Sequence, residues 1–160
     1  MLFAKGKSSS TMTFLTPIRN MRMSMSSVFE QVGAPLNNHM WSWGAVREQD
    51  KTLFLRVWED EGRKMDDLPE KYFIGIWTSD STDTSLGANE RRFHIELIKA
   101  GYKVYLLMCE RDATASKSSV SAFDARELRE GGRLVERDGV LWIALLARVP
   151  VRLLRPASAA

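Results

Sequence analysis

The sequence has little of what disulfide-rich and metal-stabilised proteins require. Its 160 residues include one cysteine, Cys109, and two histidines, His39 and His94. A single cysteine cannot form an internal disulfide bond, and a zinc site built on cysteine needs several thiols. We therefore expect a reducing, cytoplasmic setting, a fold that is stable without metal, and no cofactor.

Long hydrophobic runs are also missing. The longest apolar stretches, Val104–Cys109 and Val140–Ala147, have the length of strands, far below the about 18 residues of a membrane-spanning helix. This predicts that the membrane is not a partner. The 160 residues, 44% of them hydrophobic, suffice for one domain with a single core.

Acidic residues are absent from the first 25 positions, which carry four basic residues, Lys5, Lys7, Arg19 and Arg22. The net charge of +3 therefore belongs to this segment, because the remainder has 19 basic and 20 acidic residues. We expect residues 1–25 to be a flexible basic tail or the product of a misplaced translation start, residues 26–152 to form the domain, and residues 153–160 to be a C-terminal tail.

Two hairpins are predicted from alternation and turn residues. Trp41, Trp43 and Ala45 alternate with smaller residues, so we expect a strand with both tryptophans on one face, paired with Leu53–Trp58 through a turn at residues 49–51. Asp138-Gly139, between the apolar runs 134–136 and 140–147, is a strong hairpin signal.

Two further strands complete the expected sheet. Lys103–Cys109 is nearly all apolar, as in a strand covered on both faces, and Tyr72–Thr78 carries Gly75 at its centre, which suggests a bulge. The charged segment 59–70 reads as a surface loop. Residues 120–130 read as a strand edge followed by a helical turn.

One main helix is expected at about residues 88–101, with Phe93, Leu97 and Ala100 on its apolar face and Gly101 at its end. A short N-terminal helix, Val28–Val32, is expected to begin at the N-cap Ser27 and to stop at Gly33. The fold class is therefore α+β, with a curved mixed or mostly antiparallel sheet.

Catalytic motifs are mostly absent: there is no Gly-rich phosphate loop, no Gly-x-Ser-x-Gly and no pair of histidines with metal-ligand spacing. The most unusual segment is a polar loop that runs into two tryptophans. Trp41 and Trp43 offer a stacking surface for a planar base or a cation, and Asn37 or Asn38 offers hydrogen bonds to its edges. The alternative is that both indoles pack in the core.

A second candidate lies on the next strand, where Arg56, Trp58 and Asp60 share one face if the strand extends that far. Arg56 suits a phosphate or a base, next to the aromatic patch. The alternative is a cross-strand pair between arginine and a carboxylate on a solvated face. Asp60 and Glu61 form a weak signal for a divalent ion, and we predict no metal site.

The third candidate lies on the main helix. Glu90 and His94 are i, i+4 neighbours, so the carboxylate can orient the imidazole for acid or base work, with Arg91 beside them. The alternative is an ordinary surface pair, which stabilises a protein only slightly. Cys109, in an apolar strand, reads as a small buried residue rather than a nucleophile.

Three segments together resemble a known small bacterial domain. They are PLNNHMWSWGAVREQDKTLFLRVWEDE (35–61), ERRFHIELIKAGYKVYLLMCE (90–110) and GGRLVERDGVLWIALLARVPV (131–151). The domain occurs in uncharacterised proteins of mobile elements and integron gene cassettes, and beside HNH-type nucleases of defence systems. The resemblance implies no catalytic residues. No HNH segment follows residue 151, so it implies a binding domain without the nuclease.

Three functional hypotheses follow. The first is a noncatalytic module that binds nucleic acid or a nucleotide-like ligand through Asn37, Asn38, Trp41, Trp43, Arg56 and Trp58. The second is a small hydrolase or nuclease that uses His94 with Glu90 and Arg91. The third is an interaction protein that forms a homodimer through an exposed strand or helix face.

Overall fold

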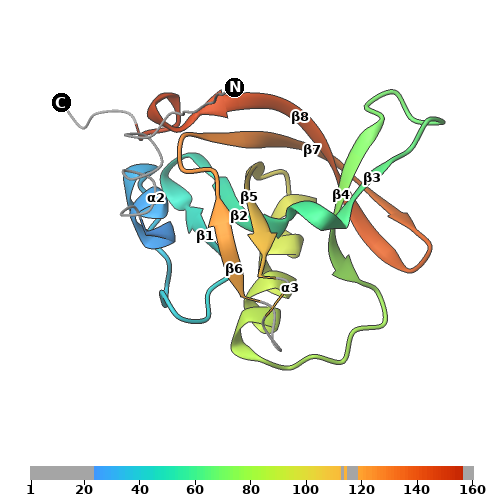
Figure 1. Cartoon of the computed structure of the whole chain (residues 1–160), viewed down its shortest axis with the longest axis horizontal. Helices are drawn as coiled ribbons and strands as arrows, with labels where there is room; N and C mark the ends of the chain where they lie inside the picture. The colour runs from blue at the N-terminus through green and yellow to red at the C-terminus, as the bar shows by residue number, and fades with distance from the viewer. Residues whose placement is uncertain (1–23, 113, 115–118, 157–160) are drawn as a thin grey trace, which may run out of the picture.

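The computed structural model describes residues 24–112, 114 and 119–156 (Figure 1). The expected N-terminal tail lies outside the described residues except for Ser24 and Met25. Neither of the two α-helices in the described part has the length and apolar character that a membrane crossing requires.

Eight strands form one open, mixed sheet in the order β1-β2-β5-β7-β8-β4-β3, with β6 paired to the far end of β5. Only β2 and β5 are parallel; the other pairs are antiparallel. The α+β class and the mixed sheet are thus confirmed. The strands are β1 (Gly44–Arg47), β2 (Thr52–Trp58), β3 (Gly62–Lys64), β4 (Tyr72–Thr78), β5 (Lys103–Arg111), β6 (Val120–Phe123), β7 (Glu127–Arg137) and β8 (Val140–Pro150).

Both predicted hairpins are confirmed. β1 and β2 are joined by the 3-10 turn η2 (Glu48–Asp50) and by Lys51, which has a φ of 54°. β7 and β8 are joined at Asp138 and Gly139, whose φ angles of 56° and 74° are both left-handed, as a two-residue type I′ turn requires. β5 lies between β2 and β7, which confirms its central place.

The bulge at Gly75 is also confirmed. The pairing of β4 with β8 passes from Gly75 opposite Trp142 to Trp77 opposite Leu141, so Ile76 is the extra residue. A side chain at Gly75 would come within 3.2 Å of Val140, so the two strands approach closely there.

Three predicted boundaries are wrong. The first strand begins at Gly44, because residues 39–41 form a turn with a hydrogen bond from the Ser42 amide to the Asn38 carbonyl, and the two tryptophans therefore precede it. Residues 120–130 contain no helical turn, since β6 and β7 both pair along β5 and leave only a short irregular connection. The loop 59–70 contains η3 (Glu59–Glu61) and β3, an exposed edge strand.

The short helix α2 (Met25–Gln31) begins earlier than predicted. Its N-cap is Ser24, whose side chain accepts a hydrogen bond from the Ser27 amide, so Ser27 lies inside the helix. Gly33, with a φ of 74°, follows its end as expected.

The main helix α3 (Leu86–Lys99) begins at the N-cap Ser85 and is followed by Gly101, with a φ of 104°. Its predicted inner face is correct only for Leu97, which packs against the core, whereas Ala100 is exposed. Phe93 is 55% exposed, whereas Glu90, Arg91 and His94 are all buried. Polar groups can be buried because neighbouring segments supply partners for Glu90 and Arg91.

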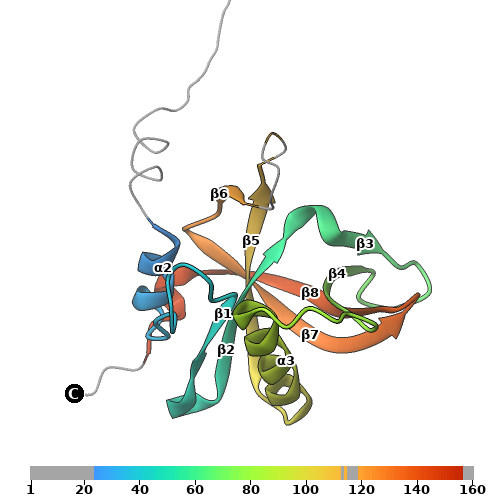
Figure 2. The same ribbon diagram turned by 90° about the horizontal axis from the view of Figure 1, so that it is seen from below.

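The core has two main layers, one on each face of the sheet. Leu53 and Leu55 of β2 pack in the layer of α3, and Phe54 between them packs in the layer of α2, as strand alternation requires. Figures 1 and 2 show α2 and α3 apart from each other, with α3 alongside β2 and β5. A third cluster joins Met65 to Phe73 and Trp142 under the β3–β4 arm.

The C-terminal segment packs against α2. Leu154 follows the 3-10 turn η4 (Val151–Leu153) and is only 6% exposed. Its carbonyl, like that of Val32, accepts a hydrogen bond from Arg47. Pro156 lies against Gly33. The packed structure therefore continues into the segment expected to be a tail.

Leu154→Ala should lower the free energy of unfolding by about 2–4 kcal/mol, because it leaves a cavity in the α2 layer. The matched control is Leu153→Ala, whose side chain is 64% exposed and should change stability by about 0.5 kcal/mol or less. Denaturant unfolding followed by circular dichroism measures both. Equal effects would contradict a packed C-terminal segment.

Candidate functional site

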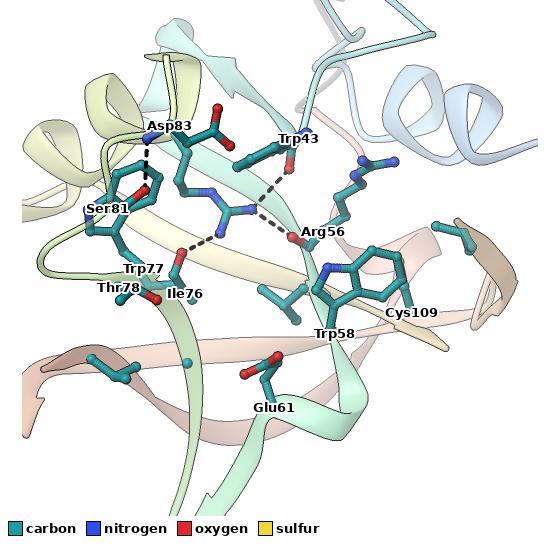
Figure 3. Close-up of a pocket in the computed structure, with 15 residues that line it drawn as sticks. Trp43, Arg56, Trp58, Glu61, Ile76, Trp77, Thr78, Ser81, Asp83 and Cys109 are labelled. Carbon is teal, nitrogen blue, oxygen red and sulfur yellow. Dashed lines mark hydrogen bonds between the residues drawn. The ribbon is translucent and has the colours of Figure 1, made fainter. Parts of the chain in front are cut away.

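A cavity of about 410 Å³ opens between the ends of β2 and β4, beside α3. Figure 3 shows the side chains around it. Its walls are aromatic and charged. The lining residues are Trp43, Arg56, Val57, Trp58, Glu61, Gly75, Ile76, Trp77, Thr78, Ser81, Asp83, Arg91, Cys109, Val120 and Val140.

Arg91 holds the two sides of this cavity at a fixed separation. Its guanidinium donates to the carbonyl of Ile76 on β4 (3.0 Å) and to that of Arg56 on β2 (2.7 Å), with a longer bond to the Trp43 carbonyl (3.4 Å). Three strands, β5, β7 and β8, lie between β2 and β4 in the sheet order. A side chain can join them only because the sheet curves, and the bulge turns the Ile76 carbonyl toward Arg91.

The Arg91 charge is buried with carbonyl partners in place of a carboxylate. Its side chain is 5% exposed, and its Nε has no hydrogen-bond partner among the described residues. Burial, with a contribution from the positive charge of Arg56, lowers the pKa of Arg91 to about 10. The group remains protonated at neutral pH and gives the cavity wall a fixed positive charge.

Each of the three indoles in the wall has an arginine against its ring. Arg91 lies 5.7 Å from the ring centre of Trp43, Arg92 lies 4.7 Å from that of Trp77, and Arg111 lies 4.4 Å from that of Trp58. Such contacts combine cation–π attraction with planar stacking. These contacts within the chain fix the orientation of the three indoles.

The remaining charges differ in how they are neutralised. Glu61 is paired with Arg111, which also binds Asp60. Arg56 has no carboxylate partner among the described residues, and its guanidinium contacts the thioether sulfur of Met25 at 3.9 Å. Burial lowers the pKa of Arg56. Arg56 is therefore a half-buried cation at the cavity wall that forms no ion pair with the described residues, although the Glu90 carboxylate lies near enough to favour its charge.

Glu90 does not line the cavity but binds the loop that carries Trp43. Its carboxylate accepts from the Trp43 amide (2.8 Å), the Ser42 hydroxyl (2.9 Å) and the Asn37 side chain (3.3 Å). It thereby fixes the loop that carries Trp43. The described residues contain no hydrogen bond between Glu90 and His94.

His94 lies on the same buried face but does not line the cavity. It is 2% exposed, and its Nδ1 has no hydrogen-bond partner in the described part of the chain. Burial, and next the charge of Arg91, lower its pKa to about 4. The imidazole is therefore neutral at pH 7 and far from the pKa that suits a general base.

The structure brings together part of the predicted set. Trp43, Arg56 and Trp58 line the cavity with Arg91, which the sequence placed in a different candidate site. Asn37, Asn38 and Trp41 are not among the lining residues. Asn38 shapes the loop instead: its amide donates to Ser42, and its side chain accepts from the Met40 amide.

Sequence reasoning missed Trp77 and Asp83. Trp77 had a usable signal, because it follows the predicted bulge at Gly75, where a strand changes direction. Asp83 lies in a Ser/Thr/Asp-rich loop and had none. The acidic pair Asp60 and Glu61 binds Arg111, and the described residues hold no group of three potential metal ligands.

Cys109 lines the cavity beside Trp58 (Figure 3). Burial raises the pKa of its thiol to about 11, so the thiol is protonated at neutral pH. It contributes apolar surface rather than a nucleophile.

Acid should destabilise the protein through His94. The unfolded histidine has a pKa of about 6.5, so the unfolded state takes up a proton first and stability falls between about pH 6.5 and pH 4. This contribution is about 3 kcal/mol. His94→Gln should remove it, and His39→Gln, at an exposed site, should leave it unchanged. Unfolding at a series of pH values tests this; an unaltered pH dependence in His94→Gln would contradict it.

Gly87→Ala should displace the Trp43 indole, because the added Cβ would lie 2.3 Å from its Nε1 and 2.8 Å from the Trp41 carbonyl oxygen. Alanine favours a helix by about 1 kcal/mol, but overpacking costs about 1–3 kcal/mol. We expect a net loss of stability and a red shift of tryptophan emission. Glu96→Ala, at an exposed site of α3, is the control. A stabilised Gly87→Ala variant with unchanged emission would refute this packing.

Comparisons with models of protein families, with curated proteins and with solved structures find no match to this chain. A ligand for the cavity can therefore be inferred only from the chemistry of its walls. That chemistry consists of three indoles held by arginines, one buried arginine, a second arginine outside the described ion pairs, and a polar end at Thr78, Ser81 and Asp83.

Proposed function

We propose that the cavity binds a small ligand with a planar ring and a negative charge, a nucleotide or a close relative, and that the protein is a noncatalytic binding module. One observation carries this proposal: Arg56, a cation without a carboxylate partner among the described residues, shares a cavity with Trp43, Trp58 and Trp77.

The cavity suits such a ligand in size and chemistry. A volume of about 410 Å³ lies within the range of about 300–1,000 Å³ found for small-molecule sites. Indole faces stack on planar bases, and a guanidinium can donate two parallel hydrogen bonds to a phosphate. A phosphate at Arg56 would supply a direct ion-pair partner.

A pocket-bound ligand is favoured over a long nucleic acid. Beyond residue 25 the chain has 19 basic and 20 acidic residues, whereas affinity for a nucleic acid backbone depends largely on excess positive charge. A role in mobile elements or defence, which the resemblance of three segments implies, belongs to the same proposal and rests on the sequence alone.

The hydrolase hypothesis finds less support in the geometry. His94 is buried outside the cavity, and the Glu90 carboxylate is engaged with the loop before β1. Catalysis needs groups that reach the substrate within hydrogen-bond distance. The binding hypothesis uses side chains that reach the cavity.

Titration with AMP, GMP, CMP and UMP should change the tryptophan emission of the protein, with heat of binding measured in parallel. Arg56→Gln should weaken binding about tenfold or more, because a charge-assisted hydrogen bond contributes about 1.5–3 kcal/mol. Arg152→Gln, at an exposed arginine away from the cavity, is the matched control. If no nucleotide alters emission or releases heat, the proposal fails.

A further inference from the structure

The cavity has two chemically different ends. Arg56 and Cys109 lie at one end, and Thr78, Ser81 and Asp83 lie at the other; Figure 3 shows these groups on opposite sides of the view, with Trp58 on the side of Arg56 and Trp77 on the side of Asp83. A ligand that spans the cavity meets a cation at one end and a carboxylate at the other.

Asp83 is available as a hydrogen-bond acceptor. Its Oδ1 accepts from the Ser85 amide at 2.9 Å, and the Ser85 side chain also bonds to the carboxylate, which holds it in place. The carboxylate is exposed, so its remaining lone pairs can accept from further donors. The described ion pairs do not include Asp83. The bonds from Ser85 lower its pKa, so the group is an ionised carboxylate at neutral pH, which only accepts.

Two hydroxyls complete this end. The Ser81 Oγ accepts from the Asp83 amide at 3.3 Å and keeps its own hydrogen for donation. The Thr78 hydroxyl has no hydrogen-bond partner in the described part of the chain. The polar end therefore offers two carboxylate oxygens that accept, next to hydroxyls that can donate.

Resting on the proposed function, we infer that the ligand is a guanine nucleotide, with its phosphate at Arg56 and its base edge at Asp83. Guanine carries two adjacent donors, N1–H and the 2-amino group, which match the two oxygens of a carboxylate. Its O6 acceptor lies beside them, where a hydroxyl of Ser81 or Thr78 can donate. Adenine, cytosine and uracil each lack this pair of donors.

The test compares GMP, IMP and XMP in calorimetric titrations of the full chain. IMP lacks only the 2-amino group, and XMP has an oxygen there. A bidentate pair discriminates between bases by about fivefold or more, so GMP should bind at least fivefold more tightly than IMP. Asp83→Asn should remove this preference and improve XMP binding, because the asparagine amide can donate to the 2-oxygen while its Oδ1 keeps the bond to the Ser85 amide.

Asp80→Asn is the matched control, since Asp80 is exposed in the same loop and does not line the cavity. Equal affinities for GMP and IMP, or an Asp83→Asn variant that behaves like Asp80→Asn, would overturn the guanine assignment. If Arg56→Gln still weakens binding of every nucleotide in that case, nucleotide binding by the cavity is supported and only the guanine assignment fails. Failure of all nucleotides to bind overturns both.

Discussion

The structure depends on one buried guanidinium. Arg91 donates to carbonyls of β2, of β4 and of the segment before β1, so it joins parts of the sheet that are not neighbours in it. The Ile76 carbonyl is buried and needs a donor, and the same arginine fork also bonds the partly buried carbonyls of Arg56 and Trp43. The curved sheet, the bulge at Gly75 and the polar inner face of α3 meet at this group. The cavity is the space left beside it.

Three buried side chains on the inner face of α3 have different structural roles. Glu90 fixes the loop that carries Trp43, Arg91 fixes the separation of the strands, and His94 fills the space against Gly44, where an added Cβ would lie 3.3 Å from its Nδ1. Burying three ionisable groups on one helix is costly unless each is hydrogen-bonded or neutral. Two are hydrogen-bonded, and the low pKa of His94 keeps the third neutral.

The elements that the sequence predicts well are those set by local chemistry. Asp138-Gly139 adopts the left-handed angles that a two-residue hairpin needs, and the apolar run in β5 reflects burial on both faces. The inner face of α3 was not predictable in this way. Apolar periodicity predicts that Phe93 is buried and Arg91 exposed. Arg91 is buried instead, because carbonyls 15 and 35 residues away in the sequence accept its hydrogen bonds. For the same reason the sequence identified Trp43, Arg56 and Trp58 but separated them from Arg91 and missed Trp77.

The arginine against each wall tryptophan has a thermodynamic consequence. A flexible side chain that becomes ordered on binding loses rotamer entropy, and this loss is subtracted from the affinity. The indoles of Trp43, Trp58 and Trp77 are held by Arg91, Arg111 and Arg92 within the folded chain. Their ordering is completed when the chain folds. A planar ligand therefore stacks on tryptophan side chains that have little rotamer entropy left to lose. More of the favourable stacking free energy then contributes to the affinity.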